Sequence, residues 1–142
     1  MRERSKMKKI LVLFVLMAAV SLMASGVAVA GSRIFISNLH CNGYGNDNKY
    51  PNREYVTFKN SSGARIAMGG WKVHDRGHIH VYTFHRGFHL GPYRSVTLRT
   101  GYGVDTASTV HWNKRSAVWN NTGDTATLLD AHGRVVSRRT CR

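Results

Sequence analysis

Residues 117–136 constrain the fold more than any other stretch, because they read as two β-strands joined by a tight turn. Residues 125–128 (TATL) alternate polar and apolar side chains with a period of two, as in a strand that buries one face. Residues 130–133 (DAHG) end in glycine and have the composition of a turn, and residues 134–139 return as the partner strand. The sequence therefore predicts a β-hairpin in the last part of the chain.

Short segments of the same kind precede this hairpin and are separated by Gly, Asn, Asp, Ser and Pro. We predict strands at residues 33–39, 54–60, 64–68, 71–75, 78–84 and 93–100, and a short or edge strand at 110–112. No window combines the 3.6-residue apolar spacing of an amphipathic helix with matching start and stop signals. Many short strands with a turn about every 8 to 12 residues are typical of a sandwich or barrel. The sequence thus predicts a single all-β domain.

The alternation also predicts which side chains face the core. Val56 and Phe58 share one face of their strand, and Val96 and Leu98 share one face of theirs. The residues that we assign mainly to the core are Trp71, Val73, Tyr82, Phe84, Val96, Leu98, Trp119, Ala126 and Leu128.

Residues 1–30 have the three parts of a secretory signal peptide. Basic residues come first, an apolar run follows at residues 10–20, and Ala28-Val29-Ala30 is a small-x-small cleavage sequence. We expect cleavage before Gly31, which leaves residues 31–142 as the domain; an uncleaved N-terminal anchor is the other interpretation. No later apolar run reaches the ~20 residues that span a bilayer, so we expect a secreted protein that is soluble or associated with the cell surface.

The two cysteines, Cys41 and Cys141, both lie in the predicted domain. A secreted chain with two cysteines most simply forms one disulfide, because its compartment is oxidising. The bridge would close a loop of 141 − 41 = 100 positions, for which chain entropy gives a stabilisation of about 4.7 kcal/mol. A reactive thiol and an intermolecular link are the alternatives.

Several short pieces of the chain occur in a characteristic order. They are residues 52–56 (NREYV), Lys59-Asn60, Gly70-Trp71, residues 82–84 (YTF), residues 90–92 (LGP), Thr100-Gly101, and residues 118–121 (VWNN) followed by 125–128 (TATL). In this order and spacing they resemble the lamin tail domain, an immunoglobulin-like β-sandwich, over residues 33–141. They are most similar to a small, secreted, bacterial version of actinobacterial type that stands alone after a signal peptide.

This resemblance implies an immunoglobulin-like antiparallel β-sandwich that acts as a binding or scaffolding module, without catalytic residues or a cofactor. The partners of nuclear lamins do not carry over to an exported chain, and a fold alone does not define a function. Arg and His are more numerous here than we expect of the family. We therefore expect any property particular to this protein to depend on its Arg and His residues.

Three histidines are the candidates for a metal site. His74, His78 and His80 are close in sequence, and a strand would project His78 and His80 from one face. With a cross-strand His74 they could hold zinc or copper; a polar, partly exposed hairpin is the alternative. Histidines beside arginines could also serve a small secreted hydrolase that acts on phosphodiesters. The sequence has no Gly-x-Ser-x-Gly motif, which would indicate a serine hydrolase, and no close pair of acidic residues, which would indicate a glycosidase.

Basic residues are the better indication of a ligand. The chain has 21 Lys and Arg against 7 Asp and Glu, and without residues 1–30 (five basic, one acidic) the charge is 16 − 6 = +10. Arginine suits bidentate contact with phosphate or carboxylate. The candidate polyanion-binding residues are Lys72, Arg76, Arg86, Arg94, Arg99, Lys114, Arg115, Arg134, Arg138 and Arg139. The aromatic residues that could stack on bases or sugars are Tyr44, Tyr50, Tyr93, Tyr102 and Trp112.

We therefore expect a non-enzymatic module that binds an anionic extracellular polymer or surface. A cell-envelope polymer or an anionic lipid surface suits an exported chain, and nucleic acid would be bound without sequence specificity, since no recognition motif is present. Three alternatives remain: the hydrolase described above, a structural protein that assembles with other envelope proteins, and positive charge that only maintains solubility. No residue pattern indicates an oligomeric state.

Overall fold

The computed structural model describes residues 33–42 and 45–142, and this part of the chain consists of ten β-strands and one short 3-10 helix. The strands are β1 (Ile34–His40), β2 (Tyr55–Asn60), β3 (Ile66–Ala67), β4 (Lys72–His74), β5 (Val81–Thr83), β6 (His89–Leu90), β7 (Ser95–Arg99), β8 (Thr109–His111), β9 (Thr125–Leu129) and β10 (Val135–Thr140). The 3-10 helix, η1 (Pro51–Arg53), precedes β2. The predicted signal peptide and its cleavage point lie outside the described residues.

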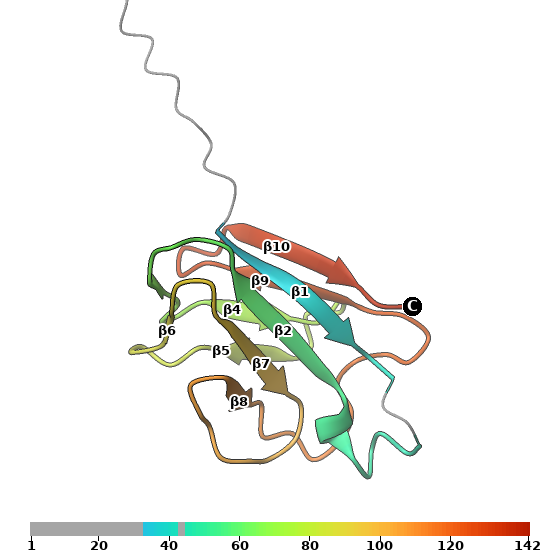
Figure 1. The fold of residues 1–142 in the computed structure, drawn as a ribbon. Helices are drawn as coiled ribbons and strands as arrows, with labels where there is room; N and C mark the ends of the chain where they lie inside the picture. Colours follow the sequence, from blue (N-terminus) through green and yellow to red (C-terminus); the bar gives the residue numbers. More distant parts are fainter. Residues whose placement is uncertain (1–32, 43–44) are drawn as a thin grey trace, which may run out of the picture. The chain divides into compact units, whose positions relative to one another are not determined.

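Two four-stranded sheets form the body of the domain. Their strand orders are β1-β2-β7-β8 and β10-β9-β4-β5, and β3 pairs with β6 in a small third sheet. Figure 1 shows the two large sheets as separate layers, with β1 and β10 side by side at one edge. There the backbone N–H of Ile36 donates to the Ser137 hydroxyl at 3.0 Å. The predicted immunoglobulin-like β-sandwich is confirmed. One strand pair departs from the predicted antiparallel arrangement, because β7 and β8 are parallel.

The core lies between the two sheets and follows the period-two alternation. In β2 and β7 the inward side chains pair across the strands, Val56 with Leu98 and Phe58 with Val96, and none is more than 1% exposed. Phe58 also packs edge-to-face on Phe84, with 5.4 Å between ring centroids. The predicted core is confirmed, except that Trp71 and Tyr82 are only half-buried at its margin.

Buried Asn60 at the end of β2 ties the small β3–β6 sheet to the sandwich. Its side-chain amide donates to the backbone carbonyls of Ala64 at 2.7 Å and Gly91 at 2.9 Å. Its carbonyl oxygen accepts from the backbone N–H of Ser62 at 2.9 Å. One side chain thus satisfies polar backbone groups that short strands leave unpaired.

Three local predictions need correction. The strand predicted at residues 78–84 begins only at Val81, because His78 adopts a left-handed φ of 57° and belongs to the turn. The strand predicted at 64–68 is reduced to two residues, and its partner β6 lies between residues 84 and 93, where we predicted no strand. Two-residue strands are too short to show a periodic pattern, so they are defined by their partner rather than by their own sequence.

Candidate functional site

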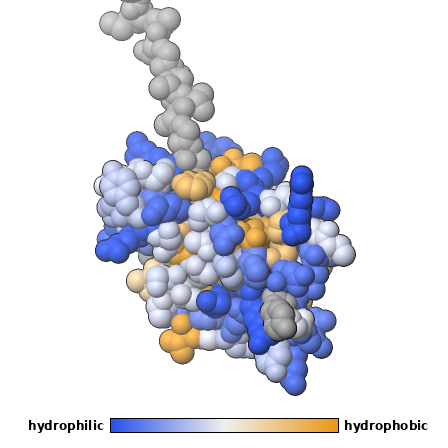
Figure 2. Space-filling model, turned by 45° about the vertical axis from the view of Figure 1, so that its right-hand side comes forward, coloured by the Kyte–Doolittle hydropathy of each residue, from blue (hydrophilic) through white to orange (hydrophobic). Residues whose placement is uncertain are grey.

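The acidic side chains of the described residues are mostly buried, whereas the basic side chains lie at the surface. Four carboxylates are buried, those of Asp47, Glu54, Asp75 and Asp124. The remaining two, Asp105 and Asp130, contact His111 at 3.1 Å and Arg134 at 2.7 Å. Figure 2 shows one face of the molecule, on which hydrophilic side chains predominate and hydrophobic ones form small separate patches. The surface therefore offers a ligand many positive groups and few free negative ones.

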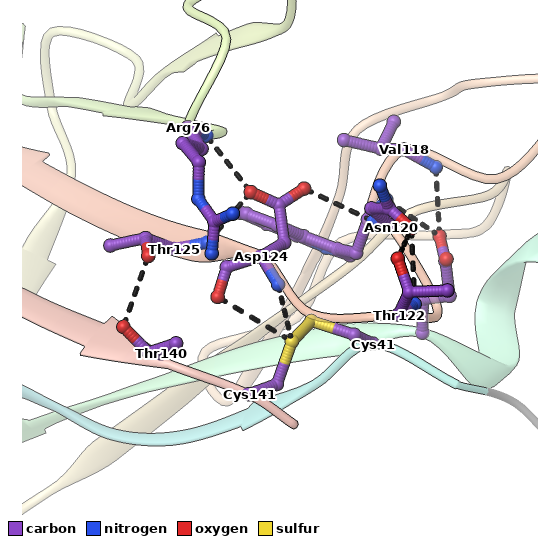
Figure 3. Close-up of a disulfide and its surroundings, with 11 residues drawn as sticks. Cys41, Arg76, Val118, Asn120, Thr122, Asp124, Thr125, Thr140 and Cys141 are labelled. Atoms are coloured by element: carbon purple, nitrogen blue, oxygen red, sulfur yellow. Dashed lines mark hydrogen bonds between the residues drawn. A yellow bond between two sulfur atoms is a disulfide. The ribbon is translucent and has the colours of Figure 1, made fainter.

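Asp124 is the buried carboxylate that organises the region around the disulfide (Figure 3). Its Oδ1 accepts from the backbone N–H of Arg76 at 3.0 Å, and its Oδ2 accepts from that of Asn120 at 3.0 Å. The predicted bridge between Cys41 and Cys141 is present, with 6.2 Å between the Cα atoms. The N–H of Cys141 donates to the Asp124 carbonyl at 3.0 Å. Asp124 thus holds the β4–β5 turn and the loop before β9 through its carboxylate, and the end of the chain through its backbone carbonyl.

Glu54, which follows η1, is a second buried carboxylate that has a structural role. It accepts from the backbone N–H of Val118 at 2.9 Å and lies 3.5 Å from that of Trp119. Burial raises the pKa of Glu54 from 4.5 to about 7, although these two N–H groups act in the opposite direction. Glu54 is fully buried and its carboxylate accepts from the backbone at residues 118 and 119, so we assign it to loop positioning.

A pocket of about 430 Å³ lies on the outer face of the β10-β9-β4-β5 sheet. Strand register explains its composition, because His74 pairs with Thr127 and Thr127 pairs with Arg138, which places the three side chains in one row. Arg76 and His78 line the pocket from the β4–β5 turn. The two arginines and two histidines therefore come from segments far apart in the sequence.

The predicted metal ligands do not converge on one point. The rings of His74 and His78 stack, with 3.7 Å between their centroids, whereas His80 turns to the Asp75 carboxylate at 3.0 Å. The predicted common face of His78 and His80 is wrong, because His78 lies in a turn and not in a strand. Within residues 33–42 and 45–142, no three His, Cys, Asp or Glu side chains are arranged to hold a metal ion.

The carboxylate of Asp75 accepts hydrogen bonds within the β4–β5 turn. Burial acts to raise its pKa, but hydrogen bonds from the His80 ring and from the backbone N–H groups of His80 and Ile79 outweigh this effect and hold the pKa below its usual value. The N–H groups of Ile79 and His80 lie 3.0 and 3.2 Å from its Oδ1. Asp75 therefore remains ionised and is occupied by the turn rather than directed at a ligand.

The ten basic candidates are only partly brought together. Lys72, Arg76, Arg134 and Arg138 belong to the pocket face or the turns that border it, although Arg134 is paired with Asp130. Arg99 lies in the other large sheet, where it donates to the Asn52 carbonyl at 2.7 Å. The candidates in loops or on the opposite face of β10 are Arg86, Arg94, Lys114, Arg115 and Arg139.

The aromatic candidates also divide. Tyr50, Tyr93 and Tyr102 are exposed, by 44%, 64% and 58% respectively. Trp112 is buried and packs edge-to-face on Trp119, with 5.7 Å between ring centroids, so its predicted role in surface stacking is wrong. Tyr44 lies outside the described residues.

A second pocket, of about 320 Å³, contains His85, His89 and Asp105 among its lining residues. The carboxylate of Asp105 contacts the His111 ring at 3.1 Å, and the His89 ring donates to the Gly87 carbonyl at 2.7 Å. A carboxylate in the wall makes this pocket less suitable for an anion than the pocket on the β10-β9-β4-β5 sheet.

No helix in the described residues is long and apolar enough to cross a membrane.

Comparison with known proteins places the chain in a family. No curated protein matches the chain. Residues 28–142, a range that includes all ten strands and both cysteines, match the Lamin Tail Domain family. The resemblance found in the sequence is thereby confirmed at the level of the family, and the chain belongs to the Lamin Tail Domain family.

Proposed function

We propose that this lamin tail domain is an exported, non-enzymatic module that binds an anionic extracellular polymer or surface. The family assignment supports a binding or scaffolding module of immunoglobulin-like fold. The observation that carries the proposal is the burial of four of the six described carboxylates, whereas the described Lys and Arg side chains are all exposed or half-buried. Cell-envelope polymers are the class of ligand that an exported basic domain would meet.

Electrostatics explains why this distribution favours a polyanion. Each exposed Lys or Arg that neutralises a ligand charge releases a condensed counterion, and that release drives association. A carboxylate at the surface would repel the ligand, but Asp75 and Asp124 are turned to backbone N–H groups instead. Their charge therefore stabilises turns and opposes a ligand less than an exposed carboxylate would.

The arrangement of the histidines supports binding over phosphodiester hydrolysis. General acid–base cleavage needs a base and an acid on opposite sides of the reacting group, with room for the substrate between them. The rings of His74 and His78 are 3.7 Å apart, which leaves no space for a phosphate between them. We accordingly prefer the binding function to the hydrolase.

The test is retention of the oxidised domain, residues 31–142, on immobilised heparin, double-stranded DNA and teichoic acid, with neutral dextran as the control polymer. We expect retention on all three anionic polymers, release by salt and no retention on dextran. Failure to bind any anionic polymer would contradict the proposal and favour a structural role in assembly with other envelope proteins.

A further inference from the structure

We propose that the pocket on the outer face of the β10-β9-β4-β5 sheet binds a single tetrahedral oxyanion, the phosphate or sulfate group of a polymer, and that His74 and His78 make this binding depend on pH. The inference rests on the proposed function and assigns it a definite site. The pocket residues that carry it are His74, Arg76, His78, Thr127 and Arg138.

The two arginines supply the fixed positive charge. Arg76 and Arg138 both line the pocket, and neither belongs to an ion pair within the part of the chain that the structure describes. Arg76 is held through its backbone N–H by Asp124, so its exposed guanidinium remains available to a ligand. A guanidinium presents paired N–H donors that match the oxygens of phosphate and sulfate.

His74 gives the pocket a donor that exists only after protonation. The ring is 5% exposed, and its Nδ1–H donates to the backbone carbonyl of Asp75 at 2.7 Å. Because a carbonyl can only accept, the neutral ring carries its proton on Nδ1 and a lone pair on Nε2. Nε2 has no hydrogen-bond partner among the described residues. A second proton on Nε2 turns this acceptor into a charged donor for an anion.

His78 adds a second imidazole ring, which stacks on His74 from the β4–β5 turn. Its φ of 57° is a conformation that side chains other than glycine adopt at a cost. In that conformation the ring covers His74, with 3.7 Å between centroids and 29° between planes. Two protonated rings so close repel each other, and a bound anion would offset the repulsion. Anion binding and proton uptake are therefore coupled, and each strengthens the other.

The carboxylates near the histidine pair are engaged by other groups, so they do not serve as the counterion of the protonated rings. On the β4–β5 turn, Asp75 is engaged by His80 and the backbone N–H of Ile79. On the β9 side, Asp124 is engaged by the backbone N–H groups of Arg76 and Asn120. At the β9–β10 turn, Asp130 is paired with Arg134 at 2.7 Å. The guanidinium of Arg138 on β10 adds only positive charge.

Titration with inorganic sulfate tests this site, with the backbone and imidazole NMR signals as the readout. Sulfate keeps its charge between about pH 5.5 and 7.5, the range in which histidines ordinarily titrate, so a change in affinity reports on the protein. We expect sulfate to shift the signals of the pocket residues and to bind at least about fivefold more tightly at the lower pH. A phosphate titration at one fixed pH shows whether the site also accepts that group.

Three variants locate the effect. Arg138→Gln should weaken sulfate binding about tenfold, whereas Arg65→Gln, which removes the same charge from an exposed loop outside the candidate binding residues, should change it less than twofold. His78→Gly suits the left-handed φ and should retain the fold while reducing the pH dependence. Equal effects of Arg138→Gln and Arg65→Gln, or pH dependence unchanged by His78→Gly, would overturn the proposal.

The two proposals fail in distinguishable ways. Retention on heparin and DNA without sulfate shifts in the pocket would overturn this site and leave the polyanion function intact. Sulfate binding in the pocket without retention on any polymer would overturn the polyanion function and leave the site.

Discussion

The backbone N–H of Arg76 donates a 3.0 Å hydrogen bond to the buried carboxylate of Asp124, across 48 positions of the sequence. The bond joins the turn after β4 to the residue that precedes β9, and it places Arg76 in the wall of a pocket that also contains Arg138. A negative side chain is thus used inside the fold to position a positive one at the surface.

Replacement of Asp124 should destabilise the domain strongly. Asp124→Ala removes the acceptor of the backbone N–H groups of Arg76, Asn120 and Thr125, and we expect a loss of about 3 kcal/mol in the free energy of unfolding. Urea denaturation measures it. Asp105→Asn is the control, because that carboxylate is about half exposed, and it should cost less than about 1 kcal/mol. Equal losses in the two variants would contradict the organising role of Asp124.

Stability should fall as the pH rises through the range in which Glu54 ionises. Burial raises the pKa of Glu54 from 4.5 to about 7, so between these values the folded chain retains a proton that the unfolded chain has lost. The contribution of this group is fully favourable below about pH 4.5 and declines by roughly 3 kcal/mol up to about pH 7. Urea denaturation at a series of pH values measures the decline.

Glu54→Gln is the matched variant for this pH dependence. Its amide oxygen can still accept from the N–H of Val118, which donates to the carboxylate at 2.9 Å, but glutamine does not titrate. We expect the decline between about pH 4.5 and 7 to disappear. A decline that persisted unchanged in this variant would show that another group causes it.

Loss of the disulfide should lower stability through the unfolded state. The bridge between Cys41 and Cys141 spans 100 positions, and chain entropy assigns about 4 to 5 kcal/mol to a loop of about that length. Thermal and urea denaturation of the double variant Cys41→Ser, Cys141→Ser, compared with the oxidised chain, measure this quantity. Similar midpoints for the two chains would exclude a stabilising role of the bridge.

The longer strands could be predicted from sequence because the alternation of polar and apolar side chains over five or more residues indicates which face is buried. This is true of β2 and β7, where every second residue is buried as expected. The disulfide followed from the number of cysteines and the expected compartment. The two-residue strands β3 and β6 and the parallel pairing of β7 with β8 depend on non-local contacts, which local sequence does not encode.

The pocket could not be predicted for a related reason. Its row of His74, Thr127 and Arg138 depends on the register of three strands, and a slip of one residue would present Arg139 in place of Arg138. The stack of His78 on His74 depends on a left-handed turn residue, whereas the sequence favoured an extended strand at that position.

The most direct test of polyanion binding is the salt dependence of the affinity of the oxidised domain for double-stranded DNA, measured by fluorescence anisotropy. A plot of the logarithm of the association constant against the logarithm of the salt concentration gives the number of phosphates neutralised. We expect a slope of about −3 or steeper, which corresponds to about three or more phosphate contacts. A slope near zero, or no binding at low salt, would contradict the proposal that the exposed basic surface binds anionic polymers.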